Sequence, residues 1–122
     1  MQKGYKDLKV YERSYKAALS VYKVTETFPE TEKYGITNQI SRASLSIPLN
    51  IAEGFAKRES QQEFKRFLLM AIGSSNEVSV LINFAKDLKM LTVEQYEAAR
   101  AEYEEIGKML SGLIKTVTKS NI

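Results

Sequence analysis

The residues best suited to chemistry form a polar row that recurs at helical spacing between positions 39 and 53. The row consists of Gln39, Arg42, Ser46, Asn50 and Glu53, and intervals of three and four place its members on one helical face. Such a face can line a groove for a ligand or an RNA, or it can form a buried hydrogen-bond network that specifies one packing. We expect the network. In it, Ser46 and Asn50 would bind the Ser44 carbonyl freed by Pro48, and Glu53 would pair with Arg42 of its own or another subunit.

The residue types that the chain lacks argue against catalysis. No histidine and no cysteine occur among its 122 residues. This removes the commonest general base, the Glu-x-x-His sites of di-iron bundles and all thiolate chemistry. The glycines at 35, 54 and 73 are isolated and form no phosphate-binding loop. We therefore expect no enzyme, no metal, no cofactor and no small-molecule substrate.

The elements that must position these residues are helices. Apolar residues recur every three to four positions, which predicts helices over about residues 7–27, 33–57, 61–89 and 93–118 of a single domain, 1–122. Capping boxes, in which two residues satisfy each other's backbone amides, mark two helix starts, Ser60 with Glu63 and Thr92 with Gln95. Long helices with short joints predict an all-α fold, an antiparallel up-down-up-down four-helix bundle.

The second helix is unusual because it contains Pro48. An interior proline removes a hydrogen bond and predicts a kink. The main apolar stripe of this helix is Ile36, Ile40, Ala43, Ile47, Ile51 and Gly54. Leu45 and Leu49 lie on another side of the helix, and a helix that is apolar nearly all round is buried on most sides. We predict that Leu45 and Leu49 contact another subunit.

Two further packing expectations come from the first and third helices. In the first helix the apolar stripe predicted to face the core is Leu8, Tyr11, Tyr15, Ala18, Leu19 and Tyr22. In the third, Gly73 costs up to about 1 kcal/mol in helix propensity, so we expect another backbone to pack closely against it.

Composition places the chain in a broad class. Hydrophobic residues make up 43% of it, enough for one core. It has no apolar run of the ~18 residues that a membrane span needs, and no charged-then-apolar leader, so we expect a cytoplasmic protein that binds no membrane.

Basic residues gather at one end of the predicted bundle, where the chain start, the joint near residue 58 and the chain end meet. This end holds ten bases, including Lys3, against five acids, while the remainder holds eight bases and ten acids. We expect phosphate contacts, which are electrostatic and salt-dependent, from Lys6, Lys9, Arg13, Lys57, Arg58, Lys65 and Arg66. The spacing of Lys6, Lys9 and Arg13, at i, i+3 and i+7, also predicts that these three bases form one stripe on the first helix. A solvated face is the alternative.

Several of these segments together resemble a known family. They are Tyr34-Gly35-Ile36, Gln39-Ile40, Arg42-Ala43, Ser46-Ile47, Asn50-Ile51-Ala52-Glu53-Gly54, Phe67-Leu68, Gly73-Ser74 and Glu77. On these residues the chain resembles the 23S rRNA intervening-sequence protein family of small bacterial four-helix bundles. The matching motif residues, structural or interfacial, are Arg42, Ser46, Asn50, Glu53, Gly54, Gly73, Ser74 and Glu77.

The resemblance implies a ring-shaped homopentamer. The family is named for genes that lie within insertions in 23S rRNA genes, which does not by itself show rRNA binding. A similar fold occurs in the accessory subunit of diversity-generating retroelements, which partners a reverse transcriptase and nucleic acid. This chain departs from the family pattern at Ser41 and Ile72, where basic residues are common, and both changes remove positive charge.

We therefore expect a non-catalytic, oligomeric nucleic-acid-binding protein, with RNA as the first ligand and DNA as the second, acting through its basic end. The alternative is a protein-interaction adaptor, such as an accessory subunit of a reverse transcriptase or another nucleic-acid enzyme.

Overall fold

The computed structural model describes residues 4–119 and shows four long helices. Over this range it contains η1 (Tyr5–Asp7), α1 (Lys9–Thr25), η2 (Glu30–Glu32), α2 (Ile36–Ala56), α3 (Gln61–Asp87) and α4 (Val93–Lys119), and no strand. The prediction of an all-α four-helix bundle is confirmed. The long helices lie within a few residues of their predicted bounds.

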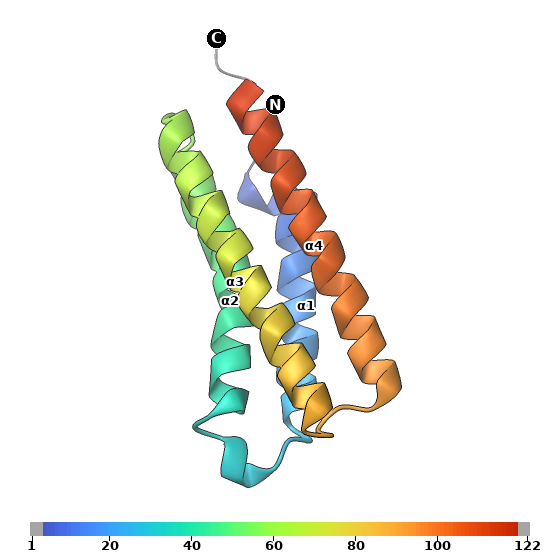
Figure 1. Ribbon diagram of the computed structural model, residues 1–122. Helices are drawn as coiled ribbons and strands as arrows, with labels where there is room; N and C mark the ends of the chain where they lie inside the picture. The colour runs from blue at the N-terminus through green and yellow to red at the C-terminus, as the bar shows by residue number, and fades with distance from the viewer. Residues whose placement is uncertain (1–3, 120–122) are drawn as a thin grey trace.

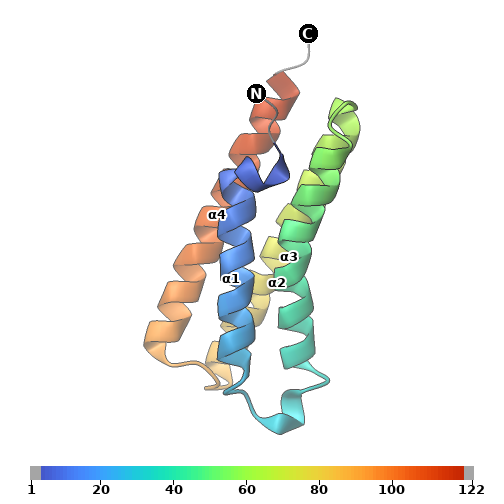
Figure 2. The same cartoon turned by 180° about the vertical axis from the view of Figure 1, so that it is seen from behind.

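Consecutive helices run in opposite directions along the bundle (Figures 1 and 2). The start of α1, the α2–α3 joint and the end of α4 therefore lie at one end of the molecule, which we term the basic end. Packing is most extensive between α2 and α3, and α1 and α4 make the least contact of the adjacent pairs. Pro48 is buried inside α2, and the kink expected there stays a prediction.

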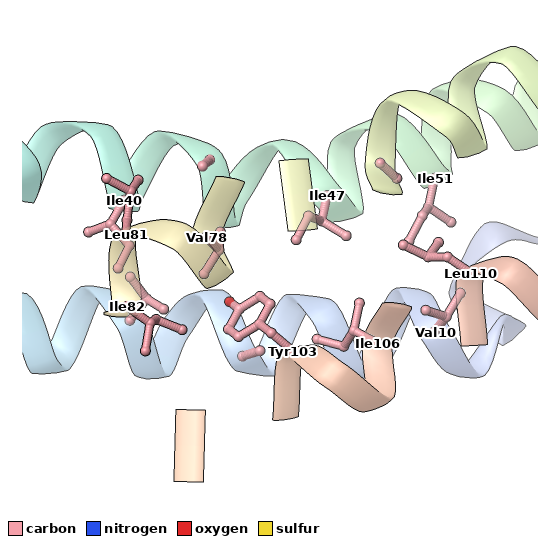
Figure 3. Packing of buried hydrophobic residues seen from close by; sticks show 14 of the residues in the cluster. Val10, Ile40, Ile47, Ile51, Val78, Leu81, Ile82, Tyr103, Ile106 and Leu110 are labelled. Carbon is pink, nitrogen blue, oxygen red and sulfur yellow. The ribbon is translucent and has the colours of Figure 1, made fainter. Parts of the chain in front are cut away.

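The core is built from the predicted stripe of α2. All six members of that stripe, from Ile36 to Gly54, are buried, and Ile47 and Ile51 are fully so. They meet Leu68 and Val78 from α3 and residues of α4 that include Leu110 (Figure 3). Buried aliphatic side chains of this size contribute about 1.5–3 kcal/mol each.

The buried face of α1 differs from the predicted one. Tyr15, Leu19 and Tyr22 are 48%, 57% and 45% exposed. The face that packs inward consists of Val10, Ser14, Ala17, Ala18 and Val21. Half of the predicted stripe does contact the core, since Ala18 is buried and Leu8 and Tyr11 pack partly buried against it. The inward face is therefore rotated relative to the prediction. It carries small residues at 14, 17 and 18, and the bulkier side chains of Tyr15, Leu19 and Tyr22 are left outside.

The chain start is not one continuous helix. Leu8 has an extended backbone (φ −77°, ψ 122°) that separates η1 from α1, and Asp7 Oδ2 accepts from the Gly4 amide at 3.0 Å. Lys6 therefore lies in η1, whereas Lys9 and Arg13 lie in α1. The predicted stripe of three bases on one helix is wrong in this respect. Lys3 lies outside the described residues.

One of the two predicted capping boxes is complete. The Thr92 amide donates to Gln95 Oε1 at 2.9 Å, and the Gln95 amide donates to Thr92 Oγ1 at 3.0 Å. At the start of α3, Ser60 Oγ accepts from the Glu63 amide at 3.1 Å. The Glu63 carboxylate, however, binds Arg66 at 3.0 and 3.1 Å. A charged partner competes better for that carboxylate than the Ser60 amide does.

Helix α3 corrects an expectation about apolar runs. Over its most apolar 18 residues its mean hydropathy is 1.4, with 39% of the window buried, which satisfies the length and composition of a membrane span. The same test is passed by core helices of soluble proteins. Here α3 supplies core residues along its length, including Phe64, Leu68, Val78 and Ala85.

Candidate nucleic-acid interface

The polar row of α2 makes hydrogen bonds that differ from the expected ones. Ser46 Oγ donates to the Ala43 carbonyl at 3.0 Å and shares a hydrogen bond with Ser74 Oγ of α3. Asn50 Nδ2 donates to the Ser46 carbonyl at 2.8 Å. The expected bonds to the Ser44 carbonyl are absent, since both side chains find acceptors elsewhere on α2. The row ties α2 to α3 through Ser46 and Ser74.

The expected pairing of Arg42 with Glu53 is not seen within this chain. Both side chains are exposed, and neither makes an ion pair within the range 4–119. These residues lie about three turns apart on α2, too far for direct contact. A pairing between subunits stays a prediction.

A shallow groove of about 540 Å³ runs along the α2–α3 face. It is lined by Asn38, Gln39, Arg42, Ala43, Leu45, Ser46, Leu49 and Glu77. We term it the motif groove, because three family-motif residues, Arg42, Ser46 and Glu77, meet there. It also contains both predicted contact residues, Leu45 at 40% and Leu49 at 59% exposure. The structure thus brings motif and contact positions onto one surface.

The two motif glycines have different environments. Gly54 is buried, and a Cβ placed on it would lie 2.8 Å from Phe67 Cβ and 3.2 Å from Phe64 Cδ1. Only glycine lets α2 approach α3 this closely. Gly73 is exposed, and a Cβ there would meet nothing within 4 Å. The expectation that a backbone packs against Gly73 is therefore wrong within this chain.

Gly54→Ala and Gly73→Ala should change stability in opposite directions. Both residues lie inside helices, so alanine gains about 1 kcal/mol of helix propensity at each site. At Gly54 the new methyl forces α2 and α3 apart, and overpacking costs about 1–3 kcal/mol. Thermal unfolding should show a lower Tm for Gly54→Ala and a higher one for Gly73→Ala. Equal Tm shifts in the two variants would show that α3 moves away from the new methyl group at position 54 at little cost.

Cations lie over aromatic rings at the α2–α3 joint, which we term the tip and define by Lys57, Arg58, Lys65 and Arg66. The Arg58 guanidinium lies 4.1 Å from the Phe55 ring centroid, and that of Arg66 lies 4.5 Å from the Phe67 centroid. Lys57 Nζ lies 5.9 Å from the same Phe67 ring. Each exposed contact of this kind contributes about 0.5–1 kcal/mol and restrains the cation.

The predicted phosphate-binding cations differ in their partners. Arg66 pairs with Glu63, and this hydrogen bond raises the pKa of Arg66 and lowers that of Glu63. The other three tip cations are exposed and make no ion pair with any described residue. The tip therefore carries a net positive charge that no neighbouring carboxylate fully offsets.

Arg13 is engaged elsewhere. Its guanidinium donates to both Glu102 oxygens of α4, at 2.8 and 3.2 Å, and this hydrogen bond raises the pKa of Arg13. The carboxylate offsets its charge locally, so Arg13 is a weaker phosphate ligand than expected. Lys6 and Lys9 are exposed at the same end as the tip.

The chain also carries exposed apolar stripes that were not predicted as sites. Besides Tyr15, Leu19 and Tyr22 on α1, a stripe of Val80, Phe84 and Leu88 on α3 is 65%, 56% and 50% exposed. The spacing of i, i+4 and i+8 was visible in the sequence. It resembles a core stripe, however, and only the structure shows that it faces outward.

Metal binding finds no support in the arrangement of carboxylates. Among residues 4–119, no group of three or more acidic side chains lies close enough together to hold an ion.

The fold and these surfaces define a small helical bundle with a cationic tip and a polar face on its second and third helices. A family model for the 23S rRNA-intervening sequence protein matches residues 6–112. The chain belongs to this family. A comparison with curated protein sequences finds no match.

A solved structure supports the same assignment. The chain is similar to a protein of unknown function from the S23 ribosomal protein family of Bacteroides thetaiotaomicron, with 28% identity and a TM-score of 0.77. The match covers 87% of this chain and 98% of that protein. Residue-level sites do not follow from this similarity, because the function of that protein is unknown.

Proposed function

We propose that the protein is a non-catalytic, oligomeric nucleic-acid-binding protein that contacts RNA phosphates through its tip. The observation that carries the proposal is the arrangement at the α2–α3 joint. Lys57, Arg58 and Lys65 project from an exposed end, and Arg58 is restrained over an aromatic ring at 4.1 Å. Restrained cations lose less conformational entropy when they bind phosphate.

Net charge at the basic end supports this function. Its described bases are Lys6, Lys9, Arg13, Lys57, Arg58, Lys65, Arg66, Lys115 and Lys119, and its acids are Asp7, Glu12, Glu53, Glu59 and Glu63. Glu102 offsets the charge of Arg13, and the bases still outnumber the acids. A surplus of positive charge on one end attracts polyanions over a Debye length of about 8–10 Å.

Oligomerisation would multiply the tip around an axis. We infer a homo-oligomer, with five subunits as the expectation that the family resemblance provides. The exposed stripes on α1 and α3 and the motif groove support it, because monomers rarely expose several apolar surfaces together. A ring requires two different surfaces on each subunit, and this chain offers more than one.

A protein adaptor in the cytoplasm, partnering a reverse transcriptase or another nucleic-acid enzyme, is the second candidate. The motif groove favours it, because Arg42 and Glu77 flank exposed Leu45 and Leu49. Apolar centres with charged margins are typical of protein interfaces.

The experiment is an RNA-binding titration with 23S rRNA fragments and unrelated RNA at several salt concentrations. We compare wild type with Lys57→Ala/Arg58→Ala/Lys65→Ala. The matched control, Lys23→Ala/Lys33→Ala/Lys89→Ala, removes the same charge at the opposite end of the bundle. We expect the tip variant to bind at least about tenfold more weakly, with a slope of log K against log salt reduced by about 2.

Three other outcomes would contradict the proposal that the tip binds RNA phosphates. Equal losses in both triple variants would indicate diffuse charge attraction. Binding that is insensitive to salt would contradict the phosphate mechanism. Absence of RNA binding by a folded, intact oligomer would favour the adaptor, which a pull-down with a co-encoded nucleic-acid enzyme would then test.

A further inference from the structure

A second opening in the surface lies between α1 and α4, away from the tip and the motif groove. Its volume is about 450 Å³, within the range of small-molecule sites. The C-terminal half of α1 and the N-terminal half of α4 form its walls, and Ile40 and Ile82 from α2 and α3 close its inner side. We term it the α1–α4 groove. It exists because α1 and α4 pack together less extensively than the other adjacent helices.

The lining is mostly apolar. On one side the lining consists of Ala17, Val21 and Val24 of α1 and of Phe28, which follows α1. On the other side it includes Leu91, which precedes α4, and Ala99 of α4. The charged residues of the lining are Lys16 and Glu102, and each already has an ion-pair partner, Glu12 at 3.4 Å and Arg13 at 2.8 Å. The Arg13–Glu102 pair also joins α1 to α4 beside the groove. An uncharged ligand fits this lining better than an ion does.

One buried polar atom beside the groove has no partner. Tyr103 lines the groove and is 3% exposed, and its buried hydroxyl oxygen makes no hydrogen bond to any described residue. A ligand therefore reaches this oxygen when the side chains that cover it move aside. In Figure 3 this oxygen points to the side of Ile82, which also lines the groove. A buried hydroxyl without a partner costs about 1–3 kcal/mol, so a bound acceptor would recover free energy.

We propose that the α1–α4 groove binds a small, uncharged apolar molecule that carries a carbonyl or ether oxygen, with this oxygen accepting a hydrogen bond from Tyr103. The apolar body would displace water from the aliphatic walls, and the single donor would orient the ligand. The proposal is independent of nucleic-acid binding, since no tip residue lines this groove.

The test uses two probes that differ only near the acceptor, 2-acetylnaphthalene and 2-ethylnaphthalene. Each is titrated into the full chain while the ¹³C-methyl signals of Ile40 and Ile82 are followed by NMR. We expect 2-acetylnaphthalene to shift both signals. Tyr103→Phe should weaken it about 5–10-fold, the value of one hydrogen bond, and change 2-ethylnaphthalene by less than about twofold. The Tm of Tyr103→Phe checks that the variant folds.

A second variant tests the site without touching the hydroxyl. Ala99→Phe places a ring in the half-buried wall of the groove and should abolish the shifts with both probes. Unchanged shifts with this variant, or equal effects of Tyr103→Phe on both probes, would overturn the proposal. Probe affinity that falls as protein concentration rises would assign the groove to a second copy of the chain and would overturn it as well.

Discussion

Replacing Leu45 and Leu49 together by aspartate is expected to convert the proposed oligomer into folded monomers. In the single chain these side chains are 40% and 59% exposed, so aspartate remains solvated and α2 keeps its buried stripe. In a subunit contact the same carboxylates would be desolvated without partners, at a cost of several kcal/mol for each contact. Since 1.4 kcal/mol is a factor of ten, the association constant should fall by about 10³ or more.

Sedimentation or light scattering gives the subunit number, and circular dichroism shows whether the helices persist. The matched control is Tyr34→Asp with Val93→Asp, which replaces side chains that are 87% and 74% exposed at the end of the bundle remote from the tip. It should leave the oligomer intact. If the Leu45/Leu49 variant also remains oligomeric, the contact belongs elsewhere, and the exposed stripe from Val80 to Leu88 becomes the next surface to test.

The sequence predicted the buried face of α2 correctly because its isoleucines leave little choice. Ile40, Ile47 and Ile51 recur at helical spacing, and burying them is the largest gain available to that helix. On α1 the choice was closer. Large side chains and small ones form adjacent stripes, and periodicity alone cannot tell which stripe faces inward. The packing of the whole bundle decides which stripe is buried, and α1 packs mainly on α2.

The candidate site was predictable in location but not in detail. Alternating helices bring Lys57 and Arg58 to the same end as Lys6 whatever the packing. The pairing of Arg13 with Glu102 could not be foreseen, because the two residues are 89 positions apart and meet only across the α1–α4 contact. Likewise, Glu63 had two local partners, and sequence does not rank Ser60 against Arg66.

The sequence alone does not distinguish Tyr103 from the other tyrosines of the chain. Its burial follows from its position in α4 beside Ile106 and Leu110, but an unsatisfied hydroxyl is a property of the finished packing. Two charged residues line the α1–α4 groove together with Tyr103, the acidic Glu102 and the basic Lys16. Burial first, and then the charge of Glu102, raise the pKa of Tyr103 well above its ordinary value.

That shift predicts loss of stability at alkaline pH. In the unfolded chain Tyr103 ionises near pH 10, whereas in the folded chain it keeps its proton to higher pH. Above about pH 10 the unfolded state therefore binds fewer protons than the folded state, and the free energy of unfolding falls as pH rises toward the folded pKa. Below pH 10 the contribution is constant. Thermal unfolding between pH 8 and 12 should show a Tm that is level at first and then declines.

Tyr103→Phe should flatten this decline, because phenylalanine cannot ionise. It should also raise the Tm at pH 8, since the unpartnered hydroxyl is removed from the core. The control is Tyr34→Phe, because Tyr34 is 87% exposed. This variant should show the same decline of Tm at alkaline pH as wild type. If both variants decline as steeply as wild type, the pKa of Tyr103 is not raised in the folded chain, and the buried, protonated hydroxyl that the proposed ligand of the α1–α4 groove requires is absent. A flattened limb in Tyr103→Phe alone would show that this hydroxyl is buried and protonated, which is the state required to donate to a ligand.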